Sequence, residues 1–150
     1  GVQTCALPIS TAKVDGANVW IGAQTWTDYV VEARIKQTFN GSDVGFMARV
    51  QAVSSNKDKG NEYYVGIKAK EDKIRLGYYD GSWHSIKEVA ATINLNDWHT
   101  VQLQMVGTSL TVYLDGSSVI SATSSQWGYG SIGLRTGNST ADYDYILACD

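Results

Sequence analysis

The sequence has few charged residues and no excess of basic ones. Charged residues make up 18% of its 150 positions, and 12 Lys and Arg stand against 15 Asp and Glu, which gives a formal net charge of −3. A protein that binds nucleic acid by neutralising phosphates needs a basic surface, so that function class is excluded. No apolar run approaches the roughly 20 residues of a membrane-spanning helix. No charged start followed by an apolar stretch marks a signal peptide.

Proline and cysteine are also scarce, and they point to an unusual start of the chain. The single proline, Pro8, and one of the two cysteines, Cys5, lie in the uncharged opening GVQTCALPIS. A reverse translation of these ten residues matches the end of a widely used short-read sequencing adapter. We therefore expect residues 1–10 to be an adapter-derived tail, with a native N-terminal strand as the alternative, and residues 11–150 to form one domain. Cys149 is then the only native cysteine.

The rest of the sequence shows the alternation of apolar and polar residues that is typical of β-strands. In residues 29–36 the odd positions are apolar and the even positions from Glu32 onward are charged, an alternation typical of a half-buried strand. No stretch carries a convincing helical stripe. The alternation, or a short apolar run, also predicts strands over 44–50, 63–67, 74–78, 101–105, 110–114, 132–134 and about 141–148.

Turn signals separate these strands at short intervals. Asp80-Gly81 and Asp115-Gly116 are typical of tight hairpins, Asn40-Gly41-Ser42 lies between two strong strands, and residues 54–60 are typical of a solvated loop. Roughly eleven short antiparallel strands predict an all-β fold, which we expect to be a two-sheet antiparallel jelly-roll sandwich.

Seven short motifs occur in order along the chain: WTDYVVEAR (26–34), VGFMAR (44–49), EYYVG (62–66), DWHTV (97–101), LTVYLDG (110–116), YGSIGLRTG (129–137) and ADYDYI (141–146). They carry a family resemblance that extends over about residues 13–148. Together they resemble the laminin-G-like, concanavalin A-like jelly rolls of bacterial extracellular proteins, and look closest to levan-binding-type carbohydrate-binding modules appended to glycoside hydrolases. The resemblance implies two antiparallel sheets, one of them concave, in an extracellular, non-catalytic and monomeric module of a larger secreted polysaccharide-degrading enzyme.

The sequence does not indicate an enzyme. Hydrolases of this fold carry Glu-x-Asp-x-x-Glu on one strand, which supplies the paired acids of a retaining glycosidase. That pattern is absent, and Asp142 and Asp144 lie on one face without a third acid. The alternatives are an adhesion or protein-interaction laminin-G-like domain and, with less support, a partial glycoside hydrolase.

We predict that an oligo- or polysaccharide binds the concave sheet. The resemblance implies which strands form that sheet, and strand parity indicates which side chains point away from the core. Aromatic rings suit the apolar faces of sugars and arginine suits pairs of hydroxyls, although an ordinary solvated strand face is the alternative. Ser131 and Gly133 would leave room above the sheet, and we expect no Asp or Glu at its outward positions. The predicted sugar-binding residues on these strands are Arg49, Tyr64, Arg75, Tyr79 and Arg135.

Aromatic loop residues are further candidates at the rim of the site. Trp127 lies in a glycine-flanked loop with Tyr129, and we predict that it too contacts sugar. Trp83 and Tyr79 flank the turn at Asp80-Gly81, where Trp83 could form a rim platform or pack between the sheets. The other three tryptophans, Trp20, Trp26 and Trp98, are expected to be packing residues at strand starts.

Calcium is expected from the resemblance alone. Relatives often bind it through carboxylates and backbone carbonyls, which suit a hard cation. The best candidate ligand is Asp144, followed by Asp142, on the last strand.

Overall fold

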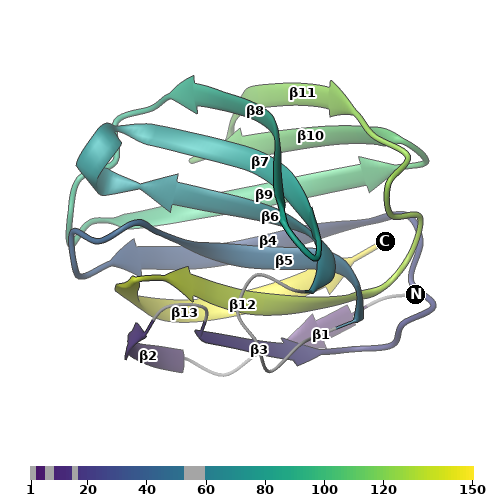
Figure 1. Cartoon of the computed structure of the whole chain (residues 1–150), viewed down its shortest axis with the longest axis horizontal. Coiled ribbons are helices and arrows are strands. Elements are labelled where there is room, and N and C mark those ends of the chain that lie inside the picture. Colours follow the sequence, from purple (N-terminus) through teal and green to yellow (C-terminus); the bar gives the residue numbers. More distant parts are fainter. Residues whose placement is uncertain (1–2, 6–8, 15–16, 53–59) are drawn as a thin grey trace.

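The protein is a sandwich of two antiparallel sheets (Figure 1). The computed structural model describes residues 3–5, 9–14, 17–52 and 60–150, and the surroundings of side chains from residue 19 onward within those ranges. The six-stranded sheet has the order β3-β12-β5-β6-β7-β8. Its strands are β3 (Ala17–Ile21), β5 (Asp43–Ala52), β6 (Asn61–Lys68), β7 (Lys73–Asp80), β8 (Trp83–Ala90) and β12 (Ser131–Gly137).

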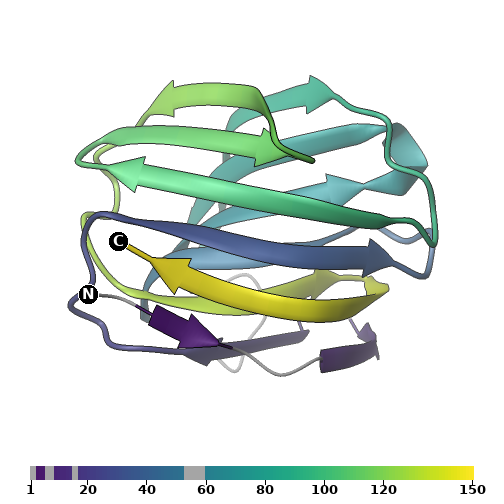
Figure 2. The same ribbon diagram turned by 180° about the vertical axis from the view of Figure 1, so that it is seen from behind.

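The seven-stranded sheet forms the other layer and faces the viewer in Figure 2. Its order is β1-β13-β4-β9-β10-β11, and β2 pairs with β13 beside β1. One short 3-10 helix, η1 (Ala69–Glu71), links β6 to β7. The strands are β1 (Gln3–Cys5), β2 (Ile9–Val14), β4 (Tyr29–Gln37), β9 (Trp98–Val106), β10 (Ser109–Leu114), β11 (Ser117–Thr123) and β13 (Ser139–Cys149).

The predicted all-β jelly-roll sandwich is confirmed, and so are the two hairpins. The alternation in β4 places every odd residue in the core between the sheets, because successive side chains of a strand point to opposite faces. The predicted loop over 54–60 lies outside the described residues except for Gly60. No helix among the described residues is long and apolar enough to cross a membrane.

The opening residues partly belong to this architecture. Gln3–Cys5 and Ile9–Val14 pair with β13 as β1 and β2, while residues 1–2 and 6–8 lie outside the described part. The adapter origin of residues 1–10 stays a prediction, because strand pairing does not reveal where a segment comes from.

Two buried tyrosines connect the two layers through hydrogen bonds of their hydroxyl groups. The Tyr143 hydroxyl donates to the carbonyl oxygens of Gly45 (2.8 Å) and Arg135 (3.0 Å) in the opposite sheet. The Tyr29 hydroxyl donates to the Gly130 carbonyl at 2.9 Å. Burial raises the pKa of both hydroxyls, so both stay protonated and act as donors.

The two sheets differ in what covers their outer faces. In β4 and β9 of the seven-stranded sheet, buried residues alternate with half-buried or exposed ones. In β5, β6 and β12 nearly every residue is buried, including those that point away from the core. Large side chains therefore lie flat against the outer face of the six-stranded sheet, and this face holds the candidate site.

Candidate carbohydrate-binding site

Two arginines face each other across two glycines on the outer face of the six-stranded sheet. Arg135 of β12 pairs with Gly45 of β5, which pairs with Gly66 of β6, which pairs with Arg75 of β7. Directly paired residues point to the same face of a sheet, so the four form one row. The two glycines leave the middle of that row without side chains, and the arginines flank the gap.

Glycines in this sheet make room for large neighbours. A Cβ atom on Gly66 would lie 2.7 Å from the Tyr64 ring, and one on Gly77 would lie 2.3 Å from the Trp83 ring. Since real Cβ atoms do not approach other atoms so closely, only glycine lets the two rings lie against the strands. The sequence requirement at these positions is therefore set by the rings that cover them.

Three aromatic rings form the floor of the site. The Tyr64 ring lies 6.5 Å from Tyr79 and 6.1 Å from Trp83, and Tyr79 lies 5.1 Å from Trp83, centroid to centroid. With Met47 and Val50 they form an apolar cluster separate from the core between the sheets. Trp83 thus belongs to the outer face, and its alternative interpretation as packing between the sheets is wrong.

The arginines lie over these rings. The Arg75 guanidinium carbon is 4.3 Å from the centroid of Trp83 and 5.5 Å from that of Tyr64. The Arg135 carbon is 4.2 Å from Tyr79 and 5.6 Å from Tyr64. Each contact of this kind contributes roughly 0.5–2 kcal/mol and fixes the plane of the guanidinium. The arrangement presents N–H donors on both sides of the Tyr64 ring.

Two buried carboxylates accompany the arginines, and sequence reasoning missed both. Asp43 forms an ion pair with Arg75, and Glu62 Oε1 lies 3.8 Å from Nη1 of Arg135. Both acids are almost fully buried. The expectation that the outward positions hold no Asp or Glu is therefore wrong. Asp43 begins β5 and Glu62 is the second residue of β6, and strand parity applied from Tyr64 and Met47 would have found them.

Burial shifts the ionisation of both acids. It raises the pKa of Glu62 from 4.5 to about 8, so this carboxyl is largely protonated at neutral pH. Burial also raises the pKa of Asp43, although Arg75 and Arg135 oppose that shift.

Several polar atoms of the site lack partners. Within the described part of the chain, Glu62 Oε2, the Tyr64 hydroxyl and Arg75 Nε are buried and make no hydrogen bond of ordinary geometry, although the Tyr64 hydroxyl lies near enough to Asp43 to lower the pKa of that acid. Each such group costs roughly 1–3 kcal/mol relative to a bonded one. All three lie on the outer face of the six-stranded sheet, beside the two arginines.

Arg49 does not join this cluster. Its guanidinium is 1% exposed and donates to the carbonyl oxygens of Thr27 (3.0 Å), Gly107 (2.9 Å) and Trp127 (2.9 Å). The register of β5 shifts after Ala48 and Arg49 has φ 47°, so strand parity no longer predicts its direction. Arg49 ties three loops together at one end of the sandwich.

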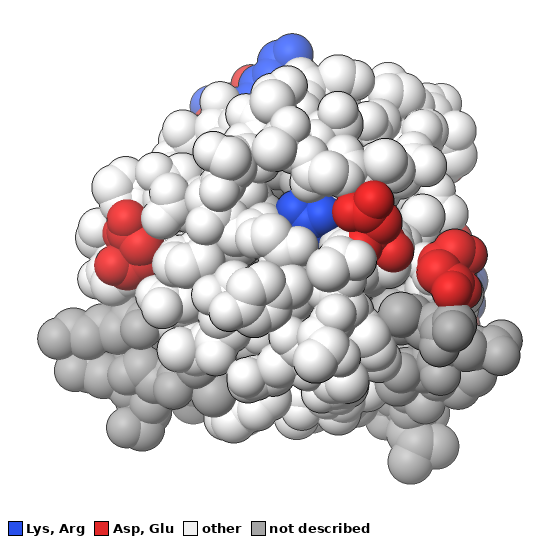
Figure 3. Space-filling view, turned by 90° about the vertical axis from the view of Figure 1, so that its right-hand side faces the viewer, with Lys and Arg blue, Asp and Glu red and all other residues white. Residues whose placement is uncertain are grey.

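Trp127 is partly buried, and its predicted contact with sugar stays a prediction. Its indole Nε1 donates to the Tyr79 carbonyl at 3.1 Å, and its ring packs against the core. Tyr129 in the same loop is 50% exposed. The described surface of this end of the sandwich shows acidic side chains beside one recessed basic patch (Figure 3).

Asp142 and Asp144 lie on the opposite sheet. Lys36 Nζ is 2.7 Å from Asp142 and Arg34 Nη1 is 2.7 Å from Asp144. Among the described residues, no three His, Cys, Asp or Glu side chains gather as a metal site requires. Calcium binding stays a prediction.

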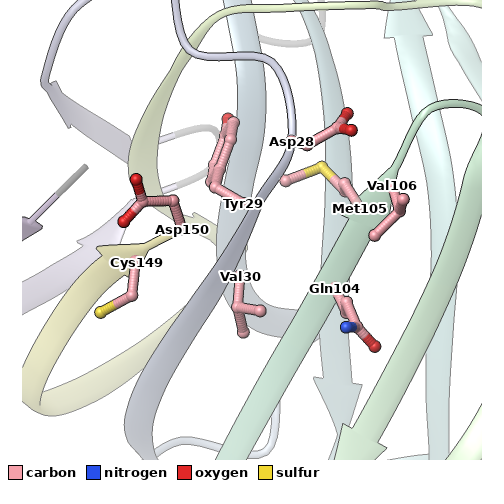
Figure 4. A pocket seen from close by; sticks show the side chains of 8 residues that line it. All are labelled: Asp28, Tyr29, Val30, Gln104, Met105, Val106, Cys149 and Asp150. Carbon is pink, nitrogen blue, oxygen red and sulfur yellow. The ribbon is translucent and has the colours of Figure 1, made fainter. Parts of the chain in front are cut away.

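A small cavity of about 150 Å³ opens at the end of the sandwich where Arg49 lies, between β4, β9 and β13 (Figure 4). Asp28 and Asp150 lie on either side of a mostly apolar lining that includes Met105. Ligand pockets usually enclose about 300 Å³ or more, so this cavity is too small to compete with the cluster on the six-stranded sheet.

Comparison with known proteins gives the family. Residues 6–147 match the family described as the 3-keto-alpha-glucoside-1,2-lyase-like domain. The chain belongs to this family. It is also 25% identical over 136 residues to a levanase of Bacillus subtilis (strain 168), and the match covers 89% of this chain but only 20% of the levanase.

Solved structures agree on the fold. A carbohydrate-binding module from Bacillus subtilis, CBM66, superposes with a TM-score of 0.75 at 21% identity and covers 99% of this chain and 95% of its own. A Bacillus licheniformis β-glucanase superposes with a TM-score of 0.66 at 16% identity, over 100% of this chain and 92% of its own. The predicted resemblance to levan-binding-type modules is therefore confirmed, while the same fold also occurs in a hydrolase.

Proposed function

We propose that this domain is a non-catalytic carbohydrate-binding module that binds a glycan on the outer face of the six-stranded sheet, which we expect to be the concave one. The observation that carries the proposal is the pair of arginines held over Tyr64, Tyr79 and Trp83, with unpartnered polar atoms beside them. A sugar ring offers an apolar C–H face to an aromatic ring and hydroxyls that both donate and accept. Arg75 and Arg135 would donate to those hydroxyls, and Glu62 and Tyr64 would complete the bonds that the protein leaves open.

We propose a levan-type fructan as the glycan. The similarity to a levanase and to the CBM66 module supports this choice. A neutral glycan also fits a site in which Asp43 offsets the charge of Arg75. Because the chain spans one fifth of that levanase, we further propose that it is a monomeric module of a larger extracellular protein.

The positions of the two acids favour binding over hydrolysis. A glycosidase holds its two carboxyls about 5–9.5 Å apart across the scissile bond. Val44 pairs with Ile67, so Asp43 lies about six residues along the sheet from Glu62, or roughly 20 Å between their backbones. The Tyr64 ring and both guanidiniums lie around the path between them. We therefore expect no release of reducing ends from levan or inulin above a heat-killed control.

Binding can be tested with arginine variants that keep the charge. Arg75→Lys and Arg135→Lys each lose the planar fork that bonds two hydroxyls at once. Both should weaken levan binding by tenfold or more in titration calorimetry, while thermal unfolding shows that they stay folded. Arg34→Lys, on the opposite sheet, is the matched control and should bind like the wild type. Equal affinity of all four proteins would place the glycan elsewhere.

A lyase function is the second candidate because of Glu62. The family description names 3-keto-glucoside cleavage, which requires a base to remove a proton beside a keto group. A buried carboxyl whose pKa is raised to about 8 has the properties of such a group. Cleavage of a 3-keto-α-glucoside by the wild type and its loss in Glu62→Gln would establish this function. No cleavage by either protein would leave binding as the activity.

A further inference from the structure

Trp20 lies on the outer face of the six-stranded sheet and is open to solvent. It belongs to the edge strand β3 and pairs with Gly133 of β12, which pairs with Met47 of β5, which pairs with Tyr64 of β6. This register places Trp20 in the same row and on the same face as the Tyr64 cluster. Its side chain is 46% exposed, so the expectation that it packs at a strand start is wrong.

A flat apolar floor connects Trp20 to the arginine pair. Gly133 carries no side chain, and a Cβ atom there would lie 2.6 Å from Met47 Cε and 3.1 Å from Trp20 Cβ. Met47 fills the next position and contacts the aromatic cluster. Three strand spacings of about 4.8 Å separate Trp20 from Tyr64, a distance of roughly 14 Å. One sugar ring cannot contact both residues, but a short chain of sugars can.

The comparison with Trp98 shows why Trp20 suits a ligand. Trp98 is also partly exposed, but Arg34 and Lys36 lie over its ring at 4.8 and 4.9 Å. Among the residues whose side chains are described, 19–52 and 60–150, no cation and no other ring lies against Trp20 in this way. An exposed ring in line with a polar, aromatic cluster is the arrangement that stacks on a further unit of a bound glycan.

We propose that Trp20 is a second sugar-stacking platform, which binds a later unit of a glycan whose first unit lies between Arg75 and Arg135. The inference rests on the proposed glycan-binding function. It adds the direction in which the bound glycan extends from the arginine pair, which is toward the edge strand β3. Affinity should then increase with chain length from fructose to levan-type oligosaccharides of about three units. A single stacking contact corresponds to a change in affinity of roughly 2- to 10-fold.

Calorimetric titration of fructose and of levan oligosaccharides of two to five units tests this proposal. Trp20→Ala should bind fructose like the wild type and should lose roughly 2- to 10-fold in affinity for oligosaccharides of three units or more. Trp20→Tyr, which keeps a ring, should recover most of that loss. Trp98→Ala is the matched control on the other sheet and should change neither affinity.

A second measurement follows Trp20 directly. Subtraction of the Trp20→Phe signal isolates its fluorescence, and a trisaccharide should protect it from acrylamide quenching while fructose should not. The inference is overturned if Trp20→Ala leaves every affinity unchanged or lowers all of them by one factor. It is also overturned if the loss appears instead in Lys70→Ala, which alters the polar hollow of about 460 Å³ between three turns at the other end of the sheet. Failure of the wild type to bind any fructan would instead refute the proposed function.

Discussion

Removing the Tyr64 hydroxyl should separate binding from stability. Tyr64 is fully buried, and its hydroxyl makes no hydrogen bond of ordinary geometry in the described part of the chain, although it lies near enough to Asp43 to lower the pKa of that acid. Tyr64→Phe keeps the ring that contacts Trp83 and both arginines and deletes only an oxygen whose desolvation is uncompensated. The free energy of unfolding should therefore stay the same or increase by about 1 kcal/mol. Levan affinity should fall by roughly fivefold, the equivalent of one hydrogen bond of about 1 kcal/mol.

Tyr143→Phe is the matched control. Tyr143 is as deeply buried, but its hydroxyl donates to two carbonyl oxygens at 2.8 and 3.0 Å. Its deletion should lower the free energy of unfolding by about 1–3 kcal/mol, because two buried acceptors lose their donor. Urea unfolding of the three proteins and calorimetry with levan measure both effects. If Tyr64→Phe is destabilised as much as Tyr143→Phe, the hydroxyl has a structural partner and the argument for a ligand at this position fails.

Three further outcomes are expected. The protonated form of Glu62 favours folding, so the contribution of this group to stability is fully present below pH 4.5 and is lost as the pH rises through about 8. Between pH 4.5 and 7 the loss from this group amounts to about 3 kcal/mol, which urea unfolding measures. Glu62→Gln should remove that fall, whereas Glu71→Gln, at an exposed acid, should keep it. Arg49→Ala should lower the free energy of unfolding by roughly 3 kcal/mol, because three carbonyls lose their donor. The affinity of the folded fraction for levan should not change. Arg34→Ala is the control and should lower the free energy of unfolding by less than about 1 kcal/mol. Deleting residues 1–10 should lower the thermal midpoint by no more than about 4 °C, and a much larger fall would mean that these residues stabilise the domain.

Strand parity predicted most of the fold because it depends on local chemistry. The alternation over 29–36 sets which face of β4 is buried, and tight turns such as Asp80-Gly81 set the pairing of their neighbours. The same rule failed at Arg49, where the register shifts and the backbone adopts a positive φ. A sequence does not mark such an irregularity, since it arises from how neighbouring strands fit.

The candidate site could be predicted only in part for a related reason. Arg75, Arg135, Tyr64 and Tyr79 were found because they lie within clear strands. Asp43 was missed because the predicted strand began one residue later, and acids are rarely buried so completely without a strong partner. Asp43 enters the site through a long-range ion pair with Arg75, and Glu62 lies beside Arg135; no local pattern encodes either contact.

The contrast between the two outer faces is the strongest reason to place function on the six-stranded sheet. On the seven-stranded sheet, charges such as Arg34 and Asp144 are solvent-exposed and pair with each other, so they cost little and need no ligand. On the six-stranded sheet, Glu62 is buried, its pKa is raised to about 8, and one of its oxygens has no partner among the described residues. A core of apolar side chains in the same place would be more stable. A protein that keeps this arrangement gives up stability that a bound ligand can restore, because hydroxyls of a glycan would supply the missing hydrogen bonds.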